Sequence, residues 1–166
     1  MKLNITKRAI VPVFFLLVVT GLGIKAMMPI SAPDFTATTL DNRRITFGQL
    51  LGKPWYLAFW SVSCSTCLAD FDQLINLHRQ LSKQGGQVIA IAVAQDKDNT
   101  ITSVAQPLMD AGITVIHDKD GSLADAFSHN GITPYGFLIN PQGHITHIHA
   151  GKLQINIILD ALQQGF

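Results

Sequence analysis

The chain has 166 residues, of which 48% are hydrophobic and 14% are charged, and its formal net charge at pH 7 is +1. This length fits one domain of about 130 residues together with an N-terminal extension. A charge balance so close to zero gives no indication of a nucleic-acid partner or an acidic substrate.

The N-terminal segment joins a basic cluster to an apolar run. Lys2, Lys7 and Arg8 precede residues 9–24, which carry no charge. A helix of this length spans about 24 Å, slightly less than a hydrocarbon core of about 30 Å, and flanking basic side chains can reach the interface. The basic end stays in the cytoplasm. We therefore predict a cytoplasmic segment over 1–8, a transmembrane signal anchor over 9–27, a linker over 28–32 and a periplasmic domain over 33–166.

A cleaved signal peptide is the alternative to this anchor. Cleavage requires small residues at a fixed spacing after the apolar run. Residues 25–30 match that requirement poorly, whereas Ile30-Ser31-Ala32 leaves the alternative open. Both versions export the rest of the chain to a compartment where disulfides persist.

The exported part alternates between apolar runs and amphipathic segments. We expect strands over 35–38, 45–47, 55–60, 88–93, 114–116, 135–139 and 145–148. We expect a helical turn over 47–52, a helix from the first cysteine to the Gly85-Gly86 pair, and helices over 100–111, 121–128 and 153–163, with a kink at Pro107. This order predicts a three-layer α/β fold with a mixed sheet flanked by helices and an N-terminal β-hairpin.

Cys64 and Cys67 are the only two cysteines, and they follow the buried strand 55–60 directly. Their spacing places both sulfurs in one helical turn, close enough to bridge, where the helix N-terminus favours a thiolate on Cys64. A structural disulfide normally closes a longer loop. Zinc needs four ligands, and no second pair stands at finger spacing. Two unrelated buried cysteines would not need this spacing. The pair therefore predicts a redox site that acts on the thiols of other proteins.

Several motifs in order resemble the membrane-tethered TlpA/ResA/DsbE branch of the thioredoxin-fold proteins, over about 32–163. They are the opening Ala-Pro-Asp-Phe at 32–35, the segment FWSVSCSTC at 59–67, Asp70, the Thr133-Pro134 pair, and FLINPQGHI at 137–145. The short anchored chain is most similar to the suppressor-of-copper-sensitivity D group. The resemblance implies a thioredoxin fold and exchange of disulfides.

The resemblance also implies roles for individual residues. Cys64 is the attacking sulfur, and Cys67 resolves the mixed disulfide. Pro134 is expected to be cis and packed against the disulfide, so that Thr133 offers its backbone to an incoming peptide as an added strand. Apart from the resemblance, we expect Trp60 to lie mostly in the core and to line the peptide groove.

Two residues depart from the pattern of the family. Ser63 replaces a tryptophan before the first cysteine, and Ala58 stands where cytoplasmic thioredoxins carry a buried carboxylate. The proton acceptor for the buried cysteine is then missing, or it is supplied by Asp70 or water. Ser65 and Thr66 carry no charge, and their hydroxyl or backbone N–H groups can stabilise the Cys64 thiolate.

The predicted function is that of a membrane-anchored protein thiol–disulfide oxidoreductase that works on exported proteins with a transmembrane redox partner. No cofactor or metal is assigned beyond the Cys64–Cys67 disulfide. A redox-independent binding or copper-handling module is the alternative. A peroxiredoxin would need P-x-x-x-T-x-x-C, but Leu57 and Ser61 occupy those positions. His147 and His149 share a strand face that we expect to be solvated.

Overall fold

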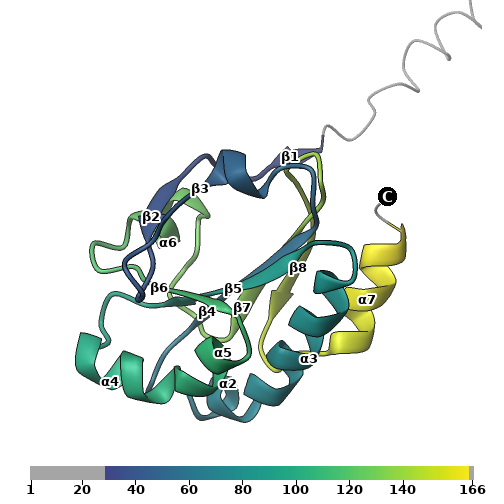
Figure 1. Cartoon of the computed structure of the whole chain (residues 1–166). Helices are drawn as coiled ribbons and strands as arrows, with labels where there is room; N and C mark the ends of the chain where they lie inside the picture. Colours follow the sequence, from purple (N-terminus) through teal and green to yellow (C-terminus); the bar gives the residue numbers. More distant parts are fainter. Residues whose placement is uncertain (1–28, 165–166) are drawn as a thin grey trace, which may run out of the picture.

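The computed structural model describes residues 29–164, so the anchor and cytoplasmic segment predicted over 1–27 lie outside the described residues. Within the described part, no helix has the length and apolar character needed to cross a membrane. Figure 1 shows β1, near the start of this part, at the opposite end of the domain from α2.

A six-stranded mixed sheet forms the centre of the domain, in the order β1-β8-β7-β4-β5-β6. Its members are β1 (Ile30–Ser31), β4 (Trp55–Trp60), β5 (Gln87–Ala92), β6 (Thr114–His117), β7 (Tyr135–Ile139) and β8 (His144–Ala150). β4, β5 and β6 are parallel, whereas β7 is antiparallel to β4 and β8 is antiparallel to β7. β4 is buried along its whole length, as its continuous apolar run predicts.

Helices cover one face of this sheet, and the N-terminal extension with one helix covers the other (Figure 1). The helices are α2 (Ser65–Ala69), α3 (Phe71–Ser82), α4 (Asp98–Val104), α5 (Gln106–Asp110), α6 (Ser122–Ala126) and α7 (Ile155–Gln164). Side chains of α3, α5 and α7 pack on one face of β4, whereas α6, the turn η1 (Phe47–Leu50) and Phe35 pack on the other. The hairpin of β2 (Thr36–Thr38) and β3 (Arg44–Thr46) forms a separate two-stranded sheet. The predicted fold class is confirmed.

The structure differs from the expected elements at three places. Ile30–Ser31, expected to lie in a linker, pairs with β8 as the edge strand β1. The helix after Cys64 is divided at Asp70 into α2 and α3. The helix expected over 100–111 is divided at Ala105, because Pro107 has no N–H group and is accommodated in the first turn of α5.

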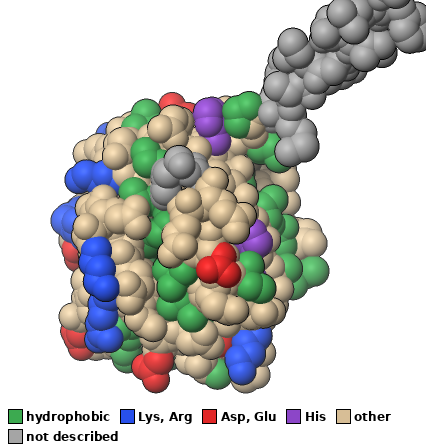
Figure 2. Space-filling view, turned by 90° about the vertical axis from the view of Figure 1, so that its right-hand side faces the viewer, with side chains coloured by type: hydrophobic (Ala, Val, Ile, Leu, Met, Phe, Trp, Pro, Cys, Tyr) green, Lys and Arg blue, Asp and Glu red, His purple; other side chains and the backbone are tan. Residues whose placement is uncertain are grey.

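The surface around α7 and β8 carries no single large charged patch. On the face seen in Figure 2, Lys and Arg side chains lie mainly along one margin, and most of the remaining surface is uncharged. This distribution agrees with the small net charge of the chain.

Candidate active site

The two cysteines lie where β4 passes into α2, and they form a disulfide with an S–S distance of 2.09 Å and a Cα–Cα distance of 5.2 Å. Cys64 is the N-cap residue of α2, and its Sγ accepts a hydrogen bond from the backbone N–H of Cys67 at 3.1 Å. The same N–H donor would stabilise a Cys64 thiolate after reduction.

The two sulfurs differ in their access to solvent. Cys64 is half-buried, whereas Cys67 is only 2% exposed and belongs to the core. Ser65 and Thr66, between them, are exposed. An incoming sulfur can therefore reach Cys64 and not Cys67.

The loop before β7 lies close to the disulfide. The Thr133–Pro134 peptide is cis, as the resemblance implies, and Pro134 lines a small cavity together with Cys67. Thr133 is half-buried, and the neighbouring Ile132 is 55% exposed. Trp60 lies in the core, as expected for most of its side chain: it is 1% exposed, its ring packs edge-on against Phe71, and it presents no open surface to a groove.

Beneath Cys67, a cavity of about 20 Å³ lies among Tyr56, Asp70 and His149. Asp70 is 2% exposed, and its Oδ2 accepts the N–H of Leu153 at 2.6 Å. Its Oδ1 has only a long contact of 3.4 Å with Gln73 Nε2. Burial, together with the negative charge of Asp70, raises the pKa of Tyr56, which therefore remains a neutral phenol. Asp70 is thus a buried carboxylate with acceptor capacity to spare, close to the buried cysteine.

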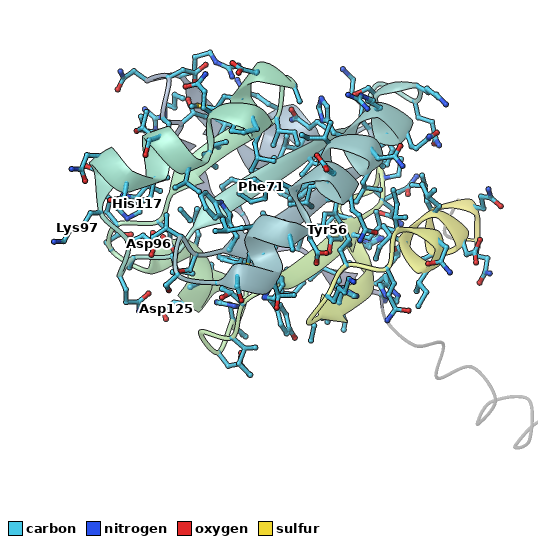
Figure 3. The ribbon with its side chains drawn as sticks, turned by 90° about the horizontal axis from the view of Figure 1, so that it is seen from below. Tyr56, Phe71, Asp96, Lys97, His117 and Asp125 are labelled. Carbon is cyan, nitrogen blue, oxygen red and sulfur yellow. A yellow bond between two sulfur atoms is a disulfide. The ribbon has the colours of Figure 1, made fainter. Side chains whose placement is uncertain are left out.

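A second aspartate, Asp96, braces the loop before Cys64. Its Oδ1 accepts the hydroxyl proton of Ser61 at 2.9 Å, and its Oδ2 accepts the N–H of Val62 at 2.9 Å. No motif in the sequence marks Asp96. One signal was present: Asp96 follows β5, β5 is parallel to β4, and the carboxyl ends of parallel strands meet at one edge of a sheet. Figure 3 shows Asp96 and Tyr56 to either side of Phe71.

The strand face with His147 and His149 is not fully solvated, contrary to expectation. His149 is 8% exposed, and its Nε2 lies 2.9 Å from the carbonyl oxygen of Gly151 and 2.8 Å from that of Lys152. Burial, and to a smaller degree the neighbouring His149, lowers the pKa of His147. Among residues 29–164, no three His, Cys, Asp or Glu side chains gather closely enough to hold a metal ion.

Comparison with known proteins adds to this geometry. The model of the AhpC/TSA family matches residues 30–148, which is well over half of the chain. The chain belongs to the AhpC/TSA family. Two relatives of this chain are named for thiol–disulfide exchange. The thiol-disulfide oxidoreductase ResA of Bacillus subtilis is 28% identical over 131 residues, covering 78% of this chain and 70% of its own. The thiol:disulfide interchange protein DsbE of Yersinia pestis is 31% identical over 127 residues, which cover 73% of this chain and 63% of DsbE.

Solved structures agree on the fold of this AhpC/TSA family member. A DsbF homologue from Corynebacterium diphtheriae superposes with a TM-score of 0.73 at 15% identity, covering 84% of this chain and 89% of its own. A secreted Mycobacterium tuberculosis disulfide oxidoreductase homologous to DsbE superposes with a TM-score of 0.65 at 20% identity, and the match covers 78% of this chain and 95% of the other. The thioredoxin-like fold is therefore established, and the enzyme class is that of a thiol–disulfide oxidoreductase, as predicted.

Proposed function

We propose that this chain is a membrane-anchored oxidoreductase that exchanges disulfides with exported proteins on the periplasmic side of the inner membrane. The observation that carries the proposal is the asymmetry of the disulfide, in which an accessible Cys64 is bonded to a buried Cys67 beside Pro134. The names of the ResA and DsbE relatives support the exchange reaction. The charge pattern of residues 1–27 supports the anchor and its orientation.

The exchange proceeds in two balanced steps. A thiolate of the client protein attacks Sγ of Cys64, the Cys64–Cys67 bond breaks, and Cys67 leaves as a thiolate that takes a proton from solvent. A second client thiolate then attacks the client sulfur of the mixed disulfide and releases the Cys64 thiolate. The client loses two electrons, and the pair gains them. The reverse sequence, in which Cys64 attacks and Cys67 resolves, reduces a client disulfide.

The loop at Thr133 supports binding of an extended client segment. Neither the N–H nor the C=O of Thr133 has a backbone hydrogen-bond partner within the described residues. Such groups can pair with a client strand laid across the disulfide. Ile132, exposed beside them, offers an apolar contact.

The direction of exchange is set by the reduction potential against that of the partner. An exported reductase needs electrons brought across the membrane, and we therefore include a transmembrane redox partner in the proposal. An exported oxidase would instead pass electrons to such a partner.

Trapping of the mixed disulfide tests the proposal. In the full-length Cys67→Ala protein, Cys64 has no resolving partner, so adducts with exported proteins should accumulate and be identified by mass spectrometry. The matched control is Cys64→Ala, which keeps Cys67 and should trap nothing because Cys67 is buried. If Cys67→Ala forms no adducts while its Cys64 reacts with a small alkylating reagent, protein exchange is wrong.

The same preparations address the alternatives. Rapid consumption of hydrogen peroxide by the reduced protein would indicate a peroxidase, which Leu57 and Ser61 disfavour at the positions of the required proline and threonine. Full biological activity of a Cys64→Ser, Cys67→Ser protein would indicate a redox-independent or copper-handling module.

A further inference from the structure

The loop between β4 and α2 contains a series of hydrogen bonds that runs from Asp96 through Ser61 to Ser63, the residue before the attacking cysteine. The Ser61 hydroxyl donates to Asp96 Oδ1 at 2.9 Å. The hydroxyl oxygens of Ser61 and Ser63 lie 2.9 Å apart, and the N–H of Ser63 donates to the same Ser61 oxygen at 3.2 Å. The N–H of Cys64 donates to the carbonyl of Ser61 at 3.1 Å. All four residues therefore act as one unit.

The direction of the bond between the two serines follows from counting protons. A serine hydroxyl has one proton and two acceptor lone pairs. The Ser61 proton is committed to Asp96, so Ser61 can only accept from Ser63. Its two lone pairs then receive the N–H and the O–H of Ser63. The Ser63 hydroxyl proton is thereby directed at Ser61, and among the described residues Ser63 makes no hydrogen bond to Sγ of the adjacent Cys64.

This orientation matters because of what a thiolate requires. A hydroxyl proton directed at the sulfur would stabilise the thiolate, whereas an oxygen lone pair does not. We propose that Asp96 is a positioning residue that holds the Ser63 hydroxyl away from Cys64 and so limits the thiolate character of the attacking sulfur. The inference rests on the proposed function of Cys64 as the attacking sulfur.

The surroundings of the cysteine pair show why Asp96 has this influence. Ser61 is 6% exposed and Asp96 is half-buried, so water has limited access to the bond between them, whereas Ser63 at the end of the chain of hydrogen bonds is exposed. Lys97 is exposed and has no hydrogen bond to this chain of residues within the described part. On the other side of the pair, Tyr56, Asp70 and His149 line the cavity under Cys67. These groups are common to every variant compared below.

Replacement of Asp96 by asparagine should reverse the hydrogen-bond chain without changing its shape. The amide oxygen can still accept the N–H of Val62, while the amide nitrogen donates to Ser61. Ser61 must then donate to Ser63, and the Ser63 proton becomes available to Cys64. A hydrogen bond to a charged group contributes about 1.5–3 kcal/mol, which corresponds to a downward shift of about one to two units in the pKa of Cys64.

The experiment titrates Cys64 by thiolate absorbance in the reduced, full-length Cys67→Ala protein, where it is the single remaining thiol. We expect D96N to lower the pKa of Cys64 by about one to two units and S63A to leave it unchanged. Combining D96N with S63A should remove more than half of the shift, because the donated proton is gone. The matched control, D72N, removes a charge from the exposed start of α3 and should have no effect.

Two results would overturn the inference. One is a D96N protein with an unchanged titration. The other is a shift that survives mainly intact in the S63A background, which would mean that the lost charge acts through space. A second measurement uses proteins with both cysteines, in which a defined reduction potential also requires a folded site. D96N should make this potential more oxidising, by up to about 30 mV for a tenfold change in the equilibrium constant of reduction. Neither readout requires a client protein, so failure of the trapping experiment leaves this test intact.

Discussion

Two buried aspartates, Asp70 after α2 and Asp118 after β6, look alike in exposure and differ in what their oxygens do. Asp118 is 3% exposed, and both of its oxygens accept backbone N–H groups at the start of α6, from Leu123 at 3.0 Å and from Ala124 at 2.8 Å. Asp70 has one short bond and one long contact, and it lines the cavity under Cys67. Burial alone therefore does not mark a functional carboxylate. Unused acceptor capacity beside a reactive group does.

The largest effect in this comparison should come from Asp118→Ala. Two N–H groups at the start of α6 would lose their charged acceptor, which should lower the free energy of unfolding by about 3 kcal/mol. Denaturant titration of the oxidised protein measures this change. Asp120→Ala, in the same loop but exposed, is the control and should have a much smaller effect. Equal stability of Asp118→Ala and wild type would contradict the structural role.

Asp70→Asn should change the rate of exchange much more than the stability of the fold. The amide oxygen still accepts the N–H of Leu153, so stability should change by less than about 1 kcal/mol. Loss of the proton acceptor should slow deprotonation of the Cys67 thiol, and with it the attack of Cys67 on a mixed disulfide at Cys64, by about a hundredfold. Stopped-flow oxidation of the reduced protein by a small disulfide measures the rate, with Asp118→Asn as the control. An unchanged rate would assign the proton to water.

Tyr56, which lies beside Asp70, should make the stability of the fold depend on pH in the alkaline range. Burial, and then the charge of Asp70, raises its pKa above the ordinary value of 10.0. A raised pKa in the folded state means that its contribution to stability is complete below about pH 10 and is lost as the pH rises beyond it. Wild type should therefore lose stability between pH 9 and pH 11, and Tyr56→Phe should lose less. Tyr135→Phe, the only other tyrosine and half-buried, is the matched control.

The smallest expected effect is on the pH dependence of stability and comes from His78, which belongs neither to the surroundings of Asp70 nor to those of Asp118. Its Nδ1 accepts the N–H of Val88 at 3.2 Å, and burial lowers the pKa of the ring. A lowered pKa in the folded state means that stability is complete above pH 6.5 and declines as the pH falls below it. Denaturant midpoints at pH 7.5 and 5.5 should differ less in His78→Asn than in wild type. A His144→Asn protein should behave like wild type.

Sequence reasoning succeeded where local pattern decides the structure. The uninterrupted apolar run of β4, the apolar spacing of α3 and the cysteine spacing all carry their information within a few residues. Pro134 was placed by resemblance and not by pattern, since spacing alone does not specify a cis peptide bond.

The failures involve partners distant in the sequence. β1 exists because Ile30 and Ser31 pair with Ile145 and His144. His149 is buried because the turn that follows β8 folds back over it, and Asp96 lies 35 residues from Ser61. Trp60 was expected in the core, but its packing against Phe71, eleven residues away, could not be seen from the sequence. Tertiary contacts of this kind override local pattern.

The placement of β1 at the opposite end of the domain from α2 has a consequence for electron supply (Figure 1). In the anchored form proposed above, the tether leaves from one end and the dithiol faces the aqueous space at the other. A compact domain of this length is about 35 Å across. A donor embedded in the bilayer would then need an arm of comparable reach, or the whole domain would have to tip over on its tether to deliver the dithiol.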